Sequence, residues 1–278
     1  MNFNEDVVDL HLHTNHSDGH FSPRELIDKI ELHGIQAVSI VDHDEVSAFP
    51  EAYEYGKSKN IEVIPGVELS VNFKNQDIHI LGYCFDYQNA QLQTYLSLFR
   101  NERLKRADKI VNKLVSMGMT LDFEELVTCA GKGTVGRPHI AKLLVQHGYV
   151  FSFQEAFDKY LGDGKPANIE KYNLDINSAV SLIKKAGGVC SIAHPAIQIK
   201  DYDLIVLIKS GIQGIEVMHP KHNSNKQKLY KNFAEEYSLI QTGGSDFHGS
   251  EKGDDSLGKC NVPYKVIGEL KKCSEFYK

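Results

Sequence analysis

The sequence has no surplus of positive charge. Its 31 Lys and Arg residues are outnumbered by 37 Asp and Glu residues, which gives a formal net charge of −6 with His neutral. Proteins that coat nucleic acid carry the opposite imbalance, so that class is excluded, although a short nucleotide bound in a cleft is compatible with this charge. An anionic substrate would have to be met locally, by metal ions or by a few placed Arg and Lys side chains.

Cysteine and long apolar runs are also scarce. The five cysteines lie far apart and include no Cys-x-x-Cys pair. This pattern predicts reduced thiols in a cytoplasmic protein and argues against a cysteine zinc site. No apolar stretch approaches the roughly 20 residues of a membrane span, and the acidic start lacks the basic flank of a signal peptide. We therefore expect no membrane association, and no obligate protein partner is evident.

What the sequence does contain is an alternation of short apolar runs with helix-like segments. Strands are expected at residues 7–12, 37–41, 61–64, 78–84, 189–193, 214–218 and 239–243. The third of these is expected to end at Pro65-Gly66. Ser22-Pro23-Arg24-Glu25 reads as a capping box that starts the first helix. Repeated strand–helix units favour an α/β fold with a parallel sheet, open or closed.

The alternation stops in the middle of the chain. Residues 91–160 show helical periodicity and no convincing strand, with helices expected at residues 100–117, 123–129, 138–146 and 153–160. We therefore predict a catalytic domain made of residues 1–88 and 172–278. The intervening residues 89–171 are predicted to form a helical insertion that caps the substrate.

Histidine is unusually frequent in this sequence, with 13 residues. Nine His, Asp and Glu residues fall in or just after the expected strands, where βα barrels keep their active sites: His11, His13, Asp18, His43, Glu68, His79, His194, Asp246 and His248. A lone histidine in a strand is commonly structural, and a lone Asp after a strand is commonly a helix cap. Burying the whole set without strong partners would cost several kcal/mol for many of its members, and cations would compensate that cost.

The ligand types indicate which cations and which chemistry to expect. Imidazole with carboxylate suits manganese, iron or zinc better than magnesium or calcium. Nine ligands are too many for one ion, so two or three divalent ions are implied. Clustered metals suit phosphoryl chemistry, because they generate hydroxide at neutral pH and stabilise the leaving oxygen.

The motifs that carry these residues resemble, in order, those of the polymerase-and-histidinol-phosphatase (PHP) family. They are Asp9-Leu10-His11-Leu12-His13, Asp42-His43-Asp44, Pro65-Gly66-Val67-Glu68, Ile78-His79-Ile80, Ala193-His194-Pro195 and Gly244-Ser245-Asp246-Phe247-His248. The insertion, with Gly136-Arg137-Pro138-His139 and Gly164-Lys165-Pro166, is similar to one branch of the family. That branch contains the nucleoside 3′,5′-bisphosphate phosphatases, which are related to enzymes that trim short RNA from its 5′ end.

The resemblance implies a distorted (β/α)7 barrel that holds three metals, commonly Mn²⁺, with Fe²⁺ or Zn²⁺ as alternatives. One metal would take His11, His13, Glu68 and Asp246; a second would take Glu68, His79 and His194; a third would take Asp18, His43 and His248. Asp246, Glu68 and His194 are the expected catalytic residues. A hydroxide bridging two metals would attack phosphorus, and Asp246 would handle its proton.

The resemblance also implies a substrate. Arg137, Lys165 and His222 are the expected substrate-binding residues, since a second phosphate needs donors away from the metals. The expected reaction is removal of the 3′-phosphate from nucleotides such as pAp, with trimming of short 5′-phosphorylated RNA as a second activity. Two alternatives are a histidinol-phosphate phosphatase, against which the helical insertion argues, and a non-catalytic metal-binding or proofreading module.

Overall fold

The computed structural model describes residues 7–131, 133–249, 256–260 and 262–278. The chain contacts divide it into two compact units. Unit 1 comprises Met1–Thr94 and Asn173–Lys278, and unit 2 comprises Tyr95–Tyr172. None of the described helices combines the length and apolar character that a bilayer crossing requires.

Unit 1 is built on one sheet whose strands follow the order β8-β7-β6-β4-β3-β2-β1-β9. These are β1 (Val7–Leu12), β2 (Ala37–Ile40), β3 (Glu62–Phe73), β4 (Gln76–Tyr83), β6 (Val189–Ile192), β7 (Gly214–Met218), β8 (Ile240–Gly243) and β9 (Val262–Pro263). A short strand, β5 (Leu174–Asp175), also pairs with β3. The expected α/β fold is confirmed, and most strand positions agree with the sequence to within one or two residues.

Strand β4 departs from the expected parallel order. It runs antiparallel to both β3 and β6, whereas β1, β2 and β3 run parallel to one another. The prediction that β3 ends at Pro65-Gly66 is wrong, because β3 continues to Phe73 and turns through Lys74 and Asn75 into β4. Both turn residues have positive φ, 52° and 62°, which is the backbone of a tight two-residue hairpin.

The sheet nearly closes on itself, because the segment after β8 returns to β1. The backbone N–H of His13 donates to the carbonyl of Phe247 at 3.0 Å, and Leu12 bridges Phe247 in parallel. Gly244 makes the approach possible, since a Cβ there would lie 2.4 Å from the backbone nitrogen of His11. The chain is thereby brought into a barrel in which the ends of β1 and β8 lie together.

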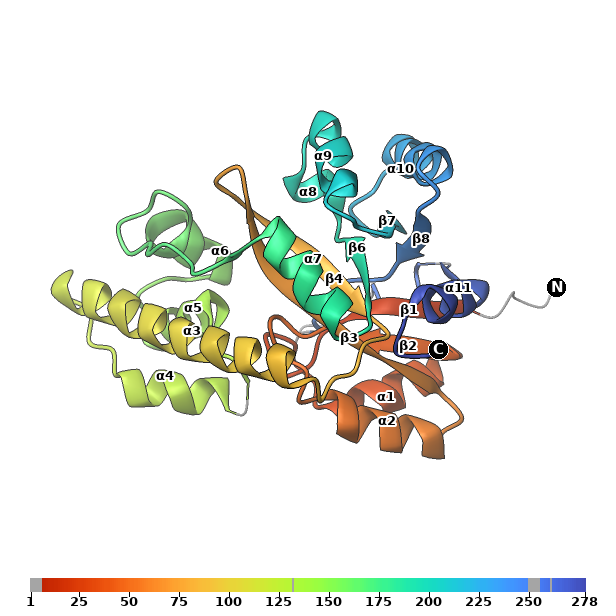
Figure 1. The fold of residues 1–278 in the computed structure, drawn as a ribbon. Helices are drawn as coiled ribbons and strands as arrows, with labels where there is room; N and C mark the ends of the chain where they lie inside the picture. The colour runs from red at the N-terminus through yellow and green to blue at the C-terminus, as the bar shows by residue number, and fades with distance from the viewer. Residues whose placement is uncertain (1–6, 132, 250–255, 261) are drawn as a thin grey trace. The chain divides into compact units, whose positions relative to one another are not determined.

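Helices cover the outside of this barrel (Figure 1). They are α1 (Pro23–Leu32), α2 (Phe49–Ser58), α7 (Ile176–Lys185), α8 (Pro195–Gln198), α9 (Leu204–Lys209), α10 (Ser224–Glu236) and α11 (Lys265–Cys273), with a 3₁₀ turn η2 (Asp201–Asp203). Helix α1 begins with the predicted capping box, in which Ser22 and Glu25 each bond the other's backbone. Its Leu26, Ile27 and Ile30 are fully buried, so the apolar stripe of the sequence is the face that meets the sheet.

Among its described residues, unit 2 contains helices joined by loops and no strand. It contains most of α3 (Ala90–Ser116), with α4 (Phe123–Ala130), α5 (Arg137–Gln146), α6 (Phe153–Ala156) and a π-helical turn η1 (Phe157–Leu161) (Figure 1). Its own core includes the fully buried side chains of Leu114, Leu126 and Leu144. Helix α3 starts ten residues earlier than the sequence pattern suggests, since 90 rather than 100 is its first residue. The unit therefore has the separate hydrophobic core that an inserted domain needs.

Candidate metal centre

The nine predicted ligands meet at one end of the barrel. Each lies near the carboxyl end of β1, β2, β6 or β8, in the loop that follows, or on the β3–β4 hairpin. His43 pairs with Glu68 through an isolated parallel bridge, and His194 follows β6 directly. Residues as distant in sequence as 11 and 248 thus share one cluster, because the carboxyl ends of parallel strands lie at the same end of the barrel.

Glu68 lies at the middle of the cluster and is only 1% exposed. Its Oε1 atom lies 2.8 Å from His79 Nδ1 and 3.0 Å from His194 Nε2. Its Oε2 atom lies 3.0 Å from His43 Nδ1, 3.4 Å from His13 Nε2 and 3.6 Å from His11 Nε2. One carboxylate therefore faces five imidazoles, which come from four segments of the chain.

Two further carboxylates extend the cluster on either side. Asp18 Oδ1 lies 3.3 Å from His248 Nε2, and its Oδ2 lies 3.6 Å from His43 Nε2. Asp246 Oδ1 lies 3.3 Å from His11 Nε2 and 3.4 Å from His13 Nε2. His13 therefore has Asp18, Asp246 and Glu68 around its ring.

Ligand atoms within 4.8 Å of one another form four overlapping groups. They are His13 with Asp18, His43 and His248; His11 with His13 and Asp246; His11 with Glu68 and His194; and His43 with Glu68 and His79. The first group contains the three residues that the family resemblance gives to one metal. The other groups share Glu68, His11 or His13, so the donor atoms form one continuous cluster.

Several buried ligand atoms of this cluster make no hydrogen bond to the protein. Among the described residues, no hydrogen bond satisfies His11 Nε2, either ring nitrogen of His13, Asp18 Oδ1, His43 Nδ1, Glu68 Oε2 or His194 Nδ1. Leaving such atoms buried and unpaired costs about 1–3 kcal/mol each. Coordination to cations would satisfy them, and the mixture of imidazole nitrogen with carboxylate oxygen fits Mn²⁺, Fe²⁺ or Zn²⁺. The residues present therefore fit a centre of several divalent ions.

The carboxylates of the cluster are held in their charged form. Burial alone would raise the pKa of Glu68, but the neighbouring His79, His43 and His11 hold that pKa well below its usual range. The pKa of Asp18 is lowered in the same way, because His43 and His248 outweigh the effect of burial. Anionic carboxylates are the form that binds cations.

The histidines divide into two kinds. Burial lowers the pKa of His43 to about 3 and also lowers that of His13, so these rings are neutral and can donate lone pairs. Burial would lower the pKa of His248 too, but Asp18 and Asp246 raise it to about 10. The pKa of His11 is likewise raised, because three carboxylates outweigh the effect of burial. Without cations, His11 and His248 hold protons that a metal ion would have to displace.

Two carboxylates beside the cluster fix its loops. Asp42 Oδ1 accepts the backbone N–H of Thr14 at 2.8 Å and the hydroxyl of Ser17 at 2.6 Å, which anchors the loop that carries Asp18. Asp44 accepts the backbone N–H and the hydroxyl of Ser70, both at 2.8 Å. The sequence motifs contain both residues, but their role becomes visible only with these contacts.

Strand β7 supplies two residues that sequence analysis missed. Glu216 Oε1 lies 3.0 Å from His11 Nδ1, and its Oε2 accepts the backbone N–H of His194 at 2.6 Å. His219 follows β7, and its Nε2 lies 3.5 Å from Asp246 Oδ2. The available signal was a charged residue inside the apolar run 214–218 and a histidine just beyond it, which is the same pattern that identified the other ligands.

Several residues of the cluster have an unusual backbone. His194 has a φ of 26°, and Asp44 and Asp246 each have a φ of 53°. Such conformations cost L-residues about 1–3 kcal/mol each and gather at functional sites. In these conformations the side chain of His194 faces Glu68 and that of Asp246 faces His11. The fold therefore holds both ligands in backbone conformations that their residue types disfavour.

The predicted substrate-binding residues have different surroundings. Arg137 and Lys165 belong to unit 2, where Arg137 Nη1 contacts Asp163 Oδ1 at 3.0 Å and the carbonyl of Leu161 at 3.2 Å. Lys165 follows that same turn and is exposed. His222 belongs to unit 1 and is buried, with its ring 5.0 Å from that of His219. His222 therefore adjoins the cluster through His219.

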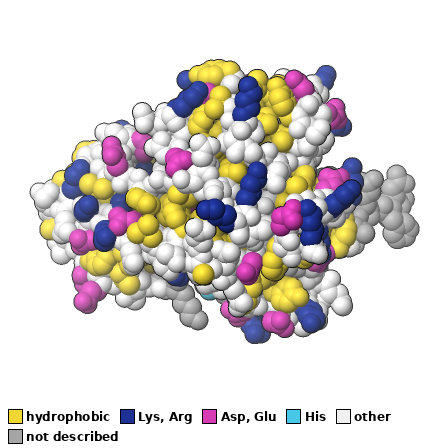
Figure 2. Space-filling view, viewed as in Figure 1, with side chains coloured by type: hydrophobic (Ala, Val, Ile, Leu, Met, Phe, Trp, Pro, Cys, Tyr) yellow, Lys and Arg dark blue, Asp and Glu magenta, His cyan; other side chains and the backbone are white. Residues whose placement is uncertain are grey.

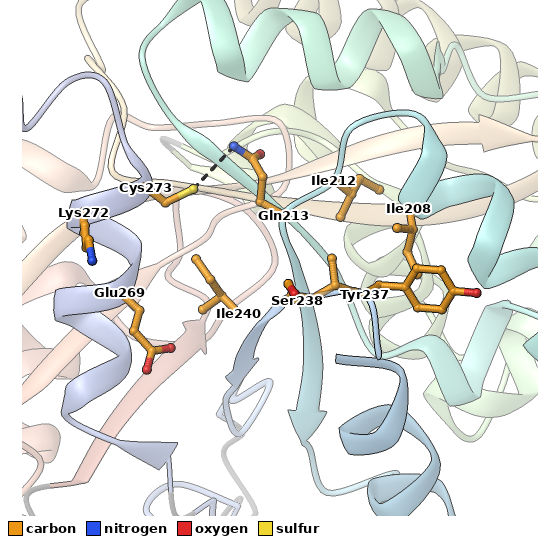
Figure 3. A pocket seen from close by; sticks show the side chains of 10 residues that line it. Ile208, Ile212, Gln213, Tyr237, Ser238, Ile240, Glu269, Lys272 and Cys273 are labelled. Carbon is orange, nitrogen blue, oxygen red and sulfur yellow. Dashed lines mark hydrogen bonds between the residues drawn. The ribbon is translucent and has the colours of Figure 1, made fainter. Parts of the chain in front are cut away.

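Figure 2 shows how charged side chains are distributed over one face of the molecule. Lys and Arg side chains there are interspersed with Asp and Glu and form no continuous basic patch, and histidine is hardly visible. The pocket in Figure 3 lies at the other end of the barrel strands, where Ile212 and Gln213 precede β7 and Ser238 and Leu239 precede β8. Its lining contains none of the predicted ligands, so the pocket is separate from the metal centre.

Comparisons with known proteins agree on one family. The PHP domain model matches residues 9–238. The chain is 35% identical to a 5′-3′ exoribonuclease of Haemophilus influenzae, over 86% of this chain and 89% of the relative. It is 31% identical to a 3′,5′-nucleoside bisphosphate phosphatase of Chromobacterium violaceum, over 90% of each. A Bifidobacterium adolescentis structure classed as a metal-dependent phosphoesterase superposes with a TM-score of 0.87, at 26% identity and 96% coverage of each chain.

Proposed function

Because this chain belongs to the PHP domain family of phosphoesterases, we propose that it removes the 3′-phosphate from nucleoside 3′,5′-bisphosphates such as pAp. The family resemblance drawn from the sequence motifs is confirmed. The observation that carries the proposal is the cluster around Glu68, in which three carboxylates and six histidines offer donor atoms. The named activity of the Chromobacterium violaceum relative supports the choice of substrate.

We further propose that the cluster holds two to three divalent ions, with Mn²⁺ as the first choice and Fe²⁺ or Zn²⁺ as alternatives. Glu68 would bridge two sites, because its Oε1 faces His79 and His194 whereas its Oε2 faces His11, His13 and His43. Asp18, His43 and His248 would hold the third ion. When bound, such ions activate water at neutral pH and neutralise charge on the phosphoryl oxygens.

The catalytic roles proposed for the protein groups follow from their positions. Asp246 Oδ1 faces His11 and His13, which leaves Oδ2 facing His219. We assign to Asp246 Oδ2 the proton of the attacking water, because this carboxylate is ionised and its Oδ2 is the oxygen that does not face His11 or His13. Glu68 and His194 would hold ions that bind the oxygens of the phosphoryl group.

We propose Arg137, Lys165 and His222 as substrate-binding residues, with Arg137 and Lys165 as the donors to the second phosphate. Arg137 is 22% exposed, and its partner Asp163 is 90% exposed. Ion pairs between exposed side chains are worth about 0–1 kcal/mol, so a phosphate can displace Asp163 at little cost. Arg can bind such a phosphate bidentately, and the exposed Lys165 follows the same turn.

The test of this substrate is phosphate release from pAp compared with p-nitrophenyl phosphate, with Mn²⁺ present. A large preference for pAp is expected, and equal rates on both compounds would remove the substrate assignment while leaving the phosphoesterase chemistry. Arg137→Ala should raise KM for pAp by about tenfold to a hundredfold, because hydrogen bonds to charged groups contribute about 1.5–3 kcal/mol. Lys159→Ala is the matched control, because it removes an exposed cation of unit 2 that pairs with Glu155.

A second candidate substrate is short 5′-phosphorylated RNA, as the name of the Haemophilus influenzae relative suggests. A competition assay would compare release of mononucleotides from a short RNA with release of phosphate from pAp. Inhibition of RNA trimming by pAp is expected if both bind one site. A cytoplasmic location is also proposed, since all five cysteines are free thiols.

A further inference from the structure

Strand β7 contributes none of the proposed metal ligands, yet it places a carboxylate at the base of the cluster. Glu216 is fully buried. Burying a charge without partners is costly, and here each oxygen has one partner: the His11 ring nitrogen Nδ1 at 3.0 Å and the backbone N–H of His194 at 2.6 Å. These two residues come from opposite parts of the sheet, β1 and the end of β6.

The contact with His11 determines which ring nitrogen faces the cluster. A carboxylate can only accept, so His11 Nδ1 must carry the proton that it donates to Glu216 Oε1. The lone pair needed for coordination is then confined to Nε2. That atom lies 3.3 Å from Asp246 Oδ1 and 3.6 Å from Glu68 Oε2, and no protein hydrogen bond satisfies it.

The contact with His194 acts on the backbone. His194 has the positive φ of 26° described above and is followed by Pro195, which begins α8. The short N–H contact to Glu216 Oε2 restrains this turn. The restrained turn aims His194 Nε2 at Glu68 Oε1, 3.0 Å away.

We propose that Glu216 is a positioning residue that orients two metal ligands at once, the ring of His11 and the backbone turn of His194. The inference rests on the proposed metal centre. It predicts that the ions held by His11 and His194 depend on Glu216. The ion held by Asp18, His43 and His248 does not, because none of those three contacts Glu216 among the described residues.

Glu216→Gln tests the proposal with little change of volume. An amide can still accept from His194, but its NH₂ group would face His11 Nδ1 and favour the tautomer with the proton on Nε2. Mn²⁺ affinity and the number of ions per chain would be measured by equilibrium dialysis with elemental analysis. We expect the affinity of the His11 and His194 sites to fall by about tenfold to a hundredfold, with the remaining site unchanged.

Two companion variants separate positioning from general stability. Asp203→Asn removes another buried carboxylate of unit 1, one that pairs with Lys74 and contacts no proposed ligand; it should bind Mn²⁺ as the wild type does. Glu216→Asp keeps the charge but is one methylene too short to reach both partners. If Glu216→Gln does not fold, Glu216→Asp serves in its place and should show a smaller loss of affinity.

The outcomes are distinguishable. Wild-type affinity and stoichiometry in Glu216→Gln, or in Glu216→Asp where that variant replaces it, would overturn the positioning role. So would an equal loss at all sites with a lowered melting temperature in chelator, which would show a purely structural role. A wild-type protein that binds no Mn²⁺, Fe²⁺ or Zn²⁺ would instead refute the proposed metal centre on which this inference rests.

Discussion

Replacing Glu68 by Gln should disable the centre while leaving the fold in place. The substitution keeps the size of the side chain and removes one charge from a position that faces five histidines. In the metal-free protein His11 and His13 retain Asp246 as a partner, and His13 and His43 retain Asp18. The loss should therefore appear in metal binding rather than in the free energy of unfolding.

The size of the effect can be worked out from the geometry. Two unit charges 4 Å apart interact by about 4 kcal/mol at the effective dielectric constant of about 20 that suits protein sites. That energy corresponds to about a thousandfold in Kd, because each 1.4 kcal/mol is about tenfold. The figure is a lower bound for Glu68, since a divalent ion doubles the charge and Glu68 belongs to two of the four ligand groups.

The assay is Mn²⁺ titration of wild type and Glu68→Gln by calorimetry, with circular dichroism in chelator as the check on folding. We expect the tight sites to vanish, phosphate release to fall by at least about a thousandfold, and the metal-free melting curve to stay near that of the wild type. A folded Glu68→Gln protein that binds Mn²⁺ within about tenfold of wild-type affinity would refute the assignment of Glu68 as the shared ligand.

Three further outcomes are expected. Mn²⁺ uptake at pH 8 should release protons, and affinity should rise with pH, because the pKa of His248 near 10 keeps that ring protonated until a cation displaces the proton; a pH-stat titration without proton release would contradict this. Gly66→Ala should lower the free energy of unfolding, measured in urea, by about 1–3 kcal/mol, since its Cβ would lie 2.0 Å from a β2 side chain. Gly268→Ala in α11 should instead raise the free energy of unfolding by about 0.5–1 kcal/mol, because its Cβ would meet open space. Asp42→Asn should weaken the site at Asp18 by about tenfold, and a Mn²⁺ titration identical to that of the wild type would show that the loop holds without this carboxylate.

Local sequence patterns predicted most elements of the fold. The strands at residues 7–12 and 214–218 agree with β1 and β7 at both ends, because apolar patterning acts over a few neighbouring residues. The direction of β4 was not predictable in this way. A strand has the same alternation in either direction, and its turn, Lys74-Asn75, lacks the glycine that usually marks a hairpin.

The metal-ligand candidates could be predicted from the sequence for a similar reason, but the groups that orient them could not. Ligand candidates are polar residues at strand ends, which the sequence displays one by one. Glu216 lies within an apolar strand, and its partner His11 is 205 residues away. The local pattern could mark Glu216 as a charge inside an apolar strand, but only the folded barrel brings it to His11 and shows that it orients that ring.

The seam between β1 and the segment after β8 also has a consequence for biosynthesis. A nascent chain exposes His11 and His13 early, whereas Asp246 and Phe247, which contact His13, are synthesised much later. The hydrogen bond from His13 to Phe247 cannot form until the segment after β8 has left the ribosome. Long-range closures of this kind form late in folding. The proposed centre can therefore select a cation only after this closure, from the ions that are free in the compartment at that time.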